Sequence, residues 1–262
     1  MSIIKAEGII LRSMKIGETS KLLTLFTREH GMLKVVAKGS RSRKSRYGAT
    51  LDPLTVIHFV YYHKDSRDLQ LLSAADIVET FPNLSLDLEK WGYANACGEL
   101  IIRSHPAAEA TPKLYPILLD SLRAMNENSS SSDRACFWGL QMKLLSVFGV
   151  PPNLRRCLQC EKDSESLADR RIFFHMGRGG FFCEKCHQGV AAFQLNRETL
   201  KQLTNLQSLP ARKILQQTFS MQVMQEIEKF FQSYFHLHLE EIGRLQSLEF
   251  VGEINFRQPI SS

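Results

Sequence analysis

The chain has 262 residues, of which 44% are hydrophobic and 23% charged, an ordinary composition for a globular protein. No apolar run approaches the roughly 18–20 residues that a membrane-spanning helix needs, and we expect no signal peptide. The six cysteines include two close pairs, a pattern typical of metal binding rather than of a secreted disulfide framework. We therefore expect a cytoplasmic protein that does not contact membranes.

The positive charge of the chain is concentrated near its N-terminus. Residues 1–50 hold eleven Lys and Arg against three Glu, a net charge of +8, whereas the whole chain carries +6. The densest part is KGSRSRKSRYG, from Lys38 to Gly48. A one-sided basic field predicts a polyanionic partner, with nucleic acid first and an anionic membrane surface second. The alternative is a merely solvated surface.

Residues 1–80 are expected to form a small β-domain. Apolar and β-branched runs separated by turn residues predict five short strands with no crossover helix, which favours an antiparallel barrel or sandwich. A five-stranded barrel of this size is typical of the OB-fold, which binds single strands along a basic face. The predicted strands are Ile3–Met14, Ser20–Thr27, Met32–Gly39, Leu54–His63 and Leu69–Glu79.

Residues 81–262 are expected to form an α-helical domain with an insert at 153–190. Helical periodicity covers Leu86–His105, with Asn83 or Ser85 as the expected N-cap. Further helices are predicted at Lys113–Met125, at Arg134–Gly149 with Asp133 as a candidate cap, at 196–207 and near Met221–Leu239. The predicted fold class is thus α+β multidomain.

The insert contains two C-x-x-C motifs, Cys157–Cys160 and Cys183–Cys186. Four thiolates in this spacing predict one closed, tetrahedral, structural Zn²⁺ site with no open position for water. Buried thiols without metal are the main alternative, because a redox C-x-x-C would need a thioredoxin-like context. His187 is a weaker candidate ligand than Cys186. The spacer RRIFFHMGRGGFF is typical of a hairpin with a tight turn.

The sequence predicts no catalytic site. It contains neither a G-x-x-x-x-G-K-[ST] phosphate loop nor a G-x-S-x-G nucleophile motif. His58 and His63 lie on or beside a predicted strand and are expected to be structural. A closed zinc site performs no hydrolysis, so we do not expect an enzyme.

These features, in this order, resemble the bacterial recombination mediator family RecO. The residues that carry the resemblance are Gly17-Glu18-Thr19-Ser20-Lys21-Leu22-Leu23, Gly31 through Ala37-Lys38-Gly39-Ser40-Arg41, the segment from Trp91 to Cys97-Gly98-Glu99-Leu100, and FGVPPNLRRCLQC. The resemblance covers essentially the whole chain and weakens toward the C-terminus.

The resemblance implies a non-enzymatic role in repair of DNA damage by the RecF pathway. Members bind single- and double-stranded DNA, anneal complementary strands, and work with RecR and RecF to load RecA onto DNA covered by the single-strand-binding protein SSB. It also implies a structural zinc, a nucleoid-associated location, and a helical pocket for the acidic SSB tail, for which Arg103, Arg123 and Arg134 are candidates.

We expect the Lys38–Gly48 loop to lie at the barrel rim and clamp phosphates. The candidate DNA-binding residues are Lys15, Lys21, Lys34, Lys38, Arg41, Arg43, Lys44 and Arg46. Gly39 and Gly48 would let the backbone fold closely. Tyr47, Phe26, Phe59 or Tyr61 are candidates for stacking on bases, with a core position as the alternative for Phe26 and Phe59. The alternatives are a general OB-fold DNA- or RNA-binding module without mediator activity, a scaffold for an acidic protein, and an enzyme.

Overall fold

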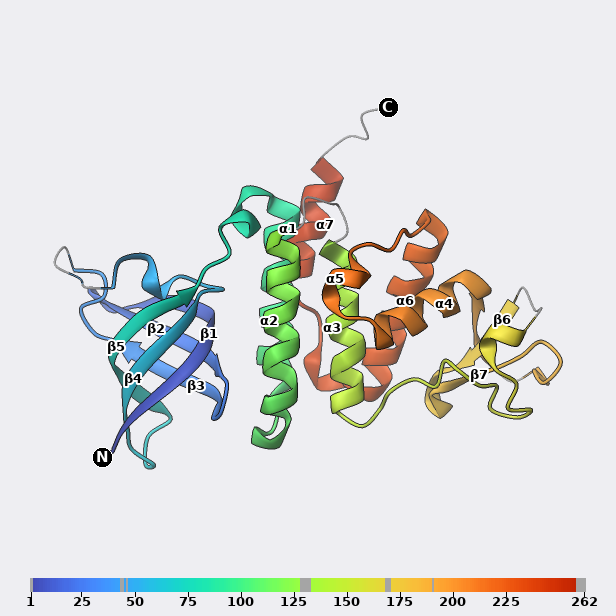
Figure 1. Ribbon diagram of the computed structural model, residues 1–262, viewed down its shortest axis with the longest axis horizontal. Helices are drawn as coiled ribbons and strands as arrows, with labels where there is room; N and C mark the ends of the chain where they lie inside the picture. The colour runs from blue at the N-terminus through green and yellow to red at the C-terminus, as the bar shows by residue number, and fades with distance from the viewer. Residues whose placement is uncertain are drawn as a thin grey trace. The chain divides into compact units, whose positions relative to one another are not determined.

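The computed structural model describes residues 2–42, 45, 47–127, 133–167, 171–189 and 191–257 (Figure 1). The chain divides into two compact units, Met1–Ser129 with Leu245–Ser262 and Ser130–Arg244. No helix in the described ranges combines the length and apolar character that crossing a membrane requires. The strands are β1 (Ser2–Ile16), β2 (Ser20–Thr27), β3 (Gly31–Ala37), β4 (Val56–His63), β5 (Leu69–Glu79), β6 (Arg171–His175), β7 (Gly180–Phe182) and β8 (Phe193–Asn196). The α-helices are α1 (Leu88–Ser104), α2 (Thr111–Glu127), α3 (Asp133–Val147), α4 (Arg197–Ser208), α5 (Ala211–Ile214), α6 (Met221–His238) and α7 (Gln246–Arg257).

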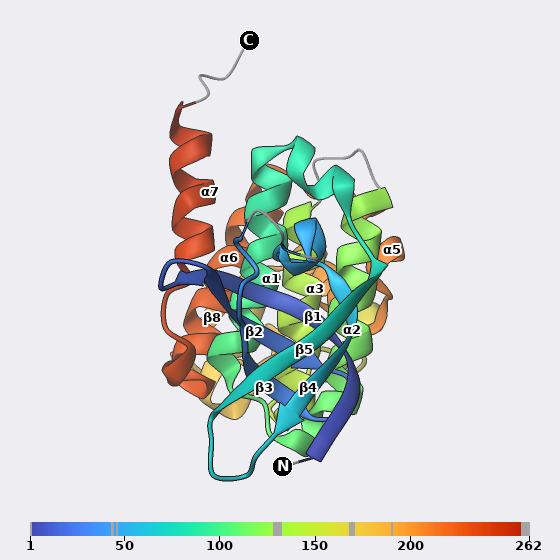
Figure 2. The same cartoon turned by 90° about the vertical axis from the view of Figure 1, so that its left-hand side faces the viewer.

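Strands β1 to β5 form a closed barrel in the order β1-β2-β3-β5-β4, and β4 pairs back onto β1 (Figure 2). The predicted five-stranded barrel of OB type, followed by helices, is therefore confirmed. The strands are not all antiparallel, because β3 and β5 run parallel. A closed ring with an odd number of strands cannot alternate direction throughout, so at least one neighbouring pair must run parallel.

Alternation along each strand separates the barrel interior from its outer face. Ile10, Leu23 and Val35 point inward and are fully buried, whereas Met14 and Lys34 point outward and are exposed. Gly8 lies where strands approach closely, because a Cβ there would lie 3.2 Å from the Phe26 carbonyl oxygen. The interior cluster consists of Ala6, Ile10, Leu23, Leu25, Val35, Ala37, Tyr47, Leu51, Ile57, Phe59, Tyr61 and Leu72.

Helix α1 begins two residues later than the sequence predicted. Its N-cap is Asp87, whose carboxylate accepts a hydrogen bond from the Lys90 backbone N–H at 2.8 Å. The expected caps Asn83 and Ser85 instead lie in a short 3-10 helix, Pro82–Leu86. The backbone N–H of Lys90 lies in the first turn and has no partner within the helix. Asp87 stands three positions before it, so its side chain can provide the cap.

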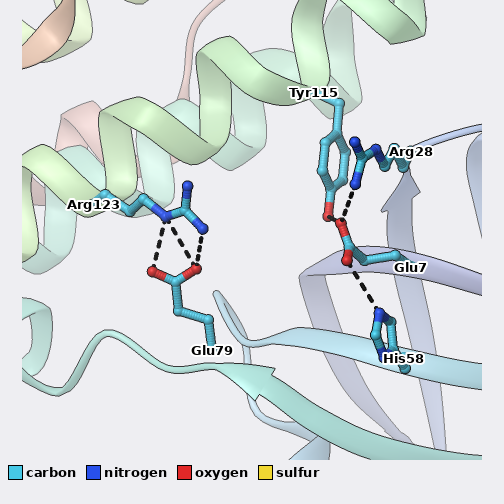
Figure 3. Close-up of polar contacts among 6 residues, drawn as sticks. All are labelled: Glu7, Arg28, His58, Glu79, Tyr115 and Arg123. Carbon is cyan, nitrogen blue, oxygen red and sulfur yellow. Dashed lines mark hydrogen bonds and ion pairs between the residues drawn. The ribbon is translucent and has the colours of Figure 1, made fainter.

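Glu7 joins the barrel to helix α2 (Figure 3). Its carboxylate accepts a hydrogen bond from the Tyr115 hydroxyl at 3.1 Å and lies 3.6 Å from Arg28 Nη1. His58 Nε2 lies 3.2 Å from the second oxygen. Burial and the charge of Glu7 raise the pKa of Tyr115, so its hydroxyl remains a donor at neutral pH. The Glu7 position of β1 is thereby held to α2.

Two further contacts support this junction. The ring of Phe26, on the outer face of β2, packs against the Tyr115 ring with centroids 5.9 Å apart. Farther along α2, Arg123 binds Glu79 through two nitrogens, with its shortest contact at 2.6 Å (Figure 3). The exposed ion pair alone contributes little, so the buried Phe26–Tyr115 contact provides most of the stabilisation.

Helix α7 returns the chain to the first unit and packs along α1. The Glu99 carboxylate accepts hydrogen bonds from the backbone N–H groups of Gln246 and Ser247 at 3.0 and 2.9 Å and from the Ser247 hydroxyl at 2.8 Å. Glu99 thus caps α7 from another helix. The two helices approach closely at Gly92, where a Cβ would collide with Val251 Cγ2.

The second unit combines helices α3 to α6 with a three-stranded sheet in the order β7-β6-β8. Phe174 of β6 packs against the rings of Phe230 and Tyr234 on α6, with centroids 5.0 and 5.9 Å away. His238 Nε2 lies 3.0 Å from the Met176 carbonyl oxygen. These contacts hold the β6–β7 hairpin against α6. The pairing of β6 with β7 confirms the hairpin predicted from the sequence.

Replacing Glu99 with Gln should loosen α7, because a single amide oxygen replaces a charged carboxylate as acceptor. We expect the free energy of unfolding to fall by about 1–2 kcal/mol and hydrogen exchange of residues 246–257 to accelerate. Glu253→Gln, at an exposed position of α7, is the matched control. Unchanged exchange in Glu99→Gln would show that Glu99 does not hold the helix.

The same contact predicts a pH dependence. Burial raises the pKa of Glu99, but hydrogen bonds from Ser247, Gln246 and Arg103 outweigh it and leave the pKa below its ordinary value of 4.5. A lowered carboxyl pKa stabilises the fold at neutral pH, and this contribution disappears as the pH falls through the lowered value. The free energies of unfolding of wild type and Glu99→Gln, measured in urea, should therefore become equal as the pH falls into the acid range.

Candidate nucleic-acid interface and metal centre

The predicted basic loop is attached to the barrel at both ends. At its start, the Arg41 backbone N–H donates to the Thr19 carbonyl at 2.9 Å. The Arg41 guanidinium donates to the carbonyls of Gly17 and Glu18 at 3.3 and 3.2 Å. At its end, Tyr47 is 5% exposed and belongs to the barrel interior. The start of the loop, at Arg41, is therefore held beside the β1–β2 turn, and its end is anchored by Tyr47 in the barrel interior.

Three of the predicted loop cations, Arg43, Lys44 and Arg46, lie outside the described residues. Gly39 and Gly48 flank the segment with φ values of +68° and +49°. Glycine adopts this left-handed region without steric cost, so both positions suit reversals of the chain. The sequence interpretation of these two glycines agrees with their backbone geometry.

The other predicted cations differ in how they are engaged. Lys34 on β3 and Lys38 just after it are exposed, and neither forms an ion pair with a described residue. Lys15 is exposed and lies opposite Lys21 in the β1–β2 register. Lys21, in contrast, forms an ion pair with Asp52 at 3.2 Å. Lys15, Lys34 and Lys38 thus contribute the least compensated charge among these residues.

The structure adds Arg12, which the sequence reasoning did not select. Arg12 lies opposite Thr24, and Thr24 lies opposite Lys34, so the three form one row across β1, β2 and β3. Arg12 and Lys34 are both exposed. Only the strand register reveals this row, because the two cations are far apart in the sequence.

The aromatic residues proposed to stack on bases are all buried. Phe59, Tyr61 and Tyr47 point into the barrel with 2%, 2% and 5% exposure, and Phe26 is covered by helix α2. A buried ring cannot meet a base, so the stacking expectation was wrong for Tyr47 and Tyr61, and for Phe26 and Phe59 the alternative of a core position holds. Tyr62, whose neighbour Tyr61 points inward, is half-buried on the outer face.

The arginines proposed for an acidic peptide are paired within the chain. Arg103 contacts Glu99 at 2.9 Å and Arg123 contacts Glu79 at 2.6 Å. Arg134 contacts Glu228 at 3.0 Å. An acidic partner at any of them would have to displace a carboxylate, which offsets much of the gain.

The four cysteines of the two C-x-x-C motifs come together in the second unit. Their sulfur atoms all lie within 4.8 Å of one another. The first motif is held on the hairpin because the Leu158 backbone N–H donates to the Phe181 carbonyl at 2.8 Å. A Cβ at Gly180 would lie 2.8 Å from Leu158 Cδ2, so a larger residue there would require the Leu158 side chain to move. His187 is outside the cluster and stacks on Phe173 with ring centroids 3.8 Å apart.

Backbone amides prepare the cluster for negative charge. Burial raises the pKa of Cys157, but N–H groups of Cys160, Cys183 and Gln159 outweigh it and hold the pKa at about 7. The Cys183 N–H lies 3.4 Å from the Cys157 sulfur. The pKa of Cys186 is raised to about 12, first by its hydrogen bond with Cys183. The environment thus lowers the thiol pKa at Cys157 and raises it at Cys186.

The geometry fits a tetrahedral ion. Four sulfurs placed about 2.3 Å from a zinc ion at tetrahedral angles are about 3.8 Å apart. Cys160 Sγ and Cys183 Sγ are separated by 3.8 Å. Four cysteine ligands also fill every position, which suits a structural metal rather than a catalytic one.

Together these features define the class: an OB-type barrel with a basic outer face, joined to helices that carry a four-cysteine ribbon. Residues 1–81 match the family model for the recombination protein O N terminal region, and residues 85–249 match that for the C terminal region. The chain therefore belongs to the RecO family.

Relatives agree along most of their length. The chain is 32% identical to the DNA repair protein RecO of Pelotomaculum thermopropionicum over 92% of this chain and 91% of that protein. It is 31% identical to the protein of the same name from Caldanaerobacter subterraneus, over 92% and 94%. It is 27% identical to that of Bacillus subtilis, over 94% of both chains.

Proposed function

We propose that the protein is a recombination mediator in DNA repair. It binds single- and double-stranded DNA, anneals complementary strands, and with RecR helps to load RecA onto strands coated by SSB. RecF and the SSB tail are further proposed partners, and a nucleoid-associated, cytoplasmic location follows. The support is family membership together with the row of cations on the outer face of the barrel.

The physical basis of annealing in this proposal is charge neutralisation. Two DNA strands repel each other through their phosphates, and cations that hold both strands reduce this repulsion. Contacts to phosphates are independent of sequence, as an annealing protein requires. The activity consists of binding and positioning strands, so no residue is assigned a catalytic role.

We also propose that the four cysteines hold one structural Zn²⁺ ion. A metal there would neutralise the thiolates and crosslink the two C-x-x-C motifs, thereby stabilising the hairpin that packs on α6. The ion would thus support the second unit and would take no part in chemistry on DNA.

The salt dependence of DNA binding tests the basic face. If four phosphates are held, the log–log slope for single strands should be about −3. Replacing Lys34 and Lys38 with Ala should reduce the slope by about 1.4, and replacing Arg41, Arg43, Lys44 and Arg46 should flatten it further. Lys229→Ala, at an exposed position on α6, is the control. An unchanged salt slope in both variants would show that DNA binds at a different surface of the protein.

Metal analysis tests the cysteine cluster. We expect one Zn²⁺ per chain and much less in Cys160→Ser, whereas Cys97→Ala, which changes a cysteine outside the cluster, should retain the ion. Because thiols must lose protons to bind metal, zinc affinity should fall as the pH falls. Chelation should accelerate hydrogen exchange in residues 171–182 while the barrel remains protected. A zinc-free protein with a protected hairpin would contradict the proposal.

Annealing of SSB-coated strands tests the mediator role. Complementary strands are coated with the cognate SSB and mixed with and without the protein, and duplex formation is followed by fluorescence quenching. The proposal predicts acceleration, which the Lys34/Lys38 double variant should reduce. Binding to bare strands without acceleration on coated strands would instead indicate a general DNA-binding module.

A further inference from the structure

An apolar stripe crosses the outer face of the barrel over all five strands. The register pairs Met14 with Leu22, Leu22 with Val36, and Val36 with Leu71. Leu71 in turn pairs with Tyr62. We call these five residues the outer stripe. They come from β1, β2, β3, β5 and β4, so no local segment of the sequence contains them together.

The outer stripe is not part of the barrel core. Met14 is 47% exposed, and the other four side chains are half-buried. Phe26 provides a contrast, because it lies on the same face of β2 as Leu22 but is fully buried beneath helix α2. The helices thus cover one end of the outer face and leave the outer stripe accessible.

Cations border the outer stripe along β3 and β1. Lys34 stands two residues before Val36 on the same face of β3, about 7 Å away along the strand. Lys38 is the first residue after β3, two positions beyond Val36. Arg12 stands two residues before Met14 and belongs to the row with Lys34. None of these cations forms an ion pair with a described residue. Apolar side chains therefore lie between uncompensated positive charges.

This combination matches the chemistry of unpaired nucleic acid. A single strand exposes charged phosphates and the apolar faces of its bases together, whereas a duplex stacks its bases inside. In this barrel, the aromatic rings that could stack on bases are buried. The side chains that remain on the outer face for this contact are aliphatic residues and Tyr62.

We propose that the outer stripe binds the bases of single-stranded DNA while Lys34, Lys38 and Arg12 hold its phosphates. The proposal rests on the DNA-binding function proposed above and deepens it, because it assigns the preference for unpaired strands to a surface separate from the charge. A protein partner is the less favoured occupant, since it would need acidic groups on both borders of the outer stripe.

The test uses a triple variant, Leu22→Thr, Val36→Thr and Leu71→Thr. Threonine is β-branched, which suits strands, but it places a hydroxyl where each of the three native side chains presents only apolar carbon. The matched control is Ile77→Thr with Val78→Thr, which changes exposed apolar residues of β5 outside the outer stripe. Thermal unfolding establishes that both variants are folded.

Each full-length protein is titrated with three probes of equal length: a single strand, an abasic strand with the same phosphates, and a duplex. We expect the triple variant to bind the single strand about tenfold more weakly, with unchanged affinity for the duplex and the abasic strand. Wild type should prefer the normal strand over the abasic strand by a similar factor, and the control should behave as wild type.

Two results with the triple variant would overturn the proposal. Equal losses for single strand and duplex would mean that the outer stripe supports the fold or the phosphate contacts. Unchanged single-strand binding would leave the outer stripe to a protein partner. Failure of wild type to bind any of the probes would instead refute the proposed DNA-binding function itself.

Photo-crosslinking of Tyr62 to iodouracil in a single strand gives a second readout that needs no mutation. Absence of this crosslink would also count against the proposal.

Discussion

Closing five strands into a barrel requires one face of every strand for the core, and this constraint decides which residues are left for the outer face of the barrel. A small barrel interior must be filled, and the rings of Phe59, Tyr61 and Tyr47 fill it. These rings are then lost as a stacking platform. Outside the barrel, the residues left for contact with a partner include the exposed cations Arg12, Lys34 and Lys38 and aliphatic side chains such as Met14 and Leu22.

The helices decide which part of that outer face stays accessible. Glu7 and Phe26 both point outward, yet both are occupied by Tyr115 of α2. Met14 and Leu22, on the same two strands, have no such cover. The position of an accessible surface on this barrel is therefore a consequence of helix packing rather than of the strand sequences.

The cysteine ribbon solves a different problem, that of stabilising a segment with little core of its own. Its strands are short, with three to five residues each. Such short strands bury too little apolar surface to be stable alone. The contact of Phe174 with α6 supports the ribbon at one side, and the four sulfurs gathered at the other are compatible with a structural metal. A closed ligand set is suited to this structural task.

The sequence by itself determined the local features of this protein. Alternating apolar residues located the strands, helical periodicity located most helices, and the C-x-x-C spacing located the sulfur cluster, because each pattern depends only on neighbours in the chain. The main miss among the helices was α7, whose N-terminus is capped by Glu99, 147 residues earlier.

Tertiary structure decided everything that depends on the pairing of distant segments. It placed Phe26 under a helix, made Arg41 a tie to the β1–β2 turn, and aligned Arg12 with Lys34. The physical reason is register. A strand pattern shows which residues share a face, but only the pairing of strands far apart in the chain shows which residues stand side by side on it.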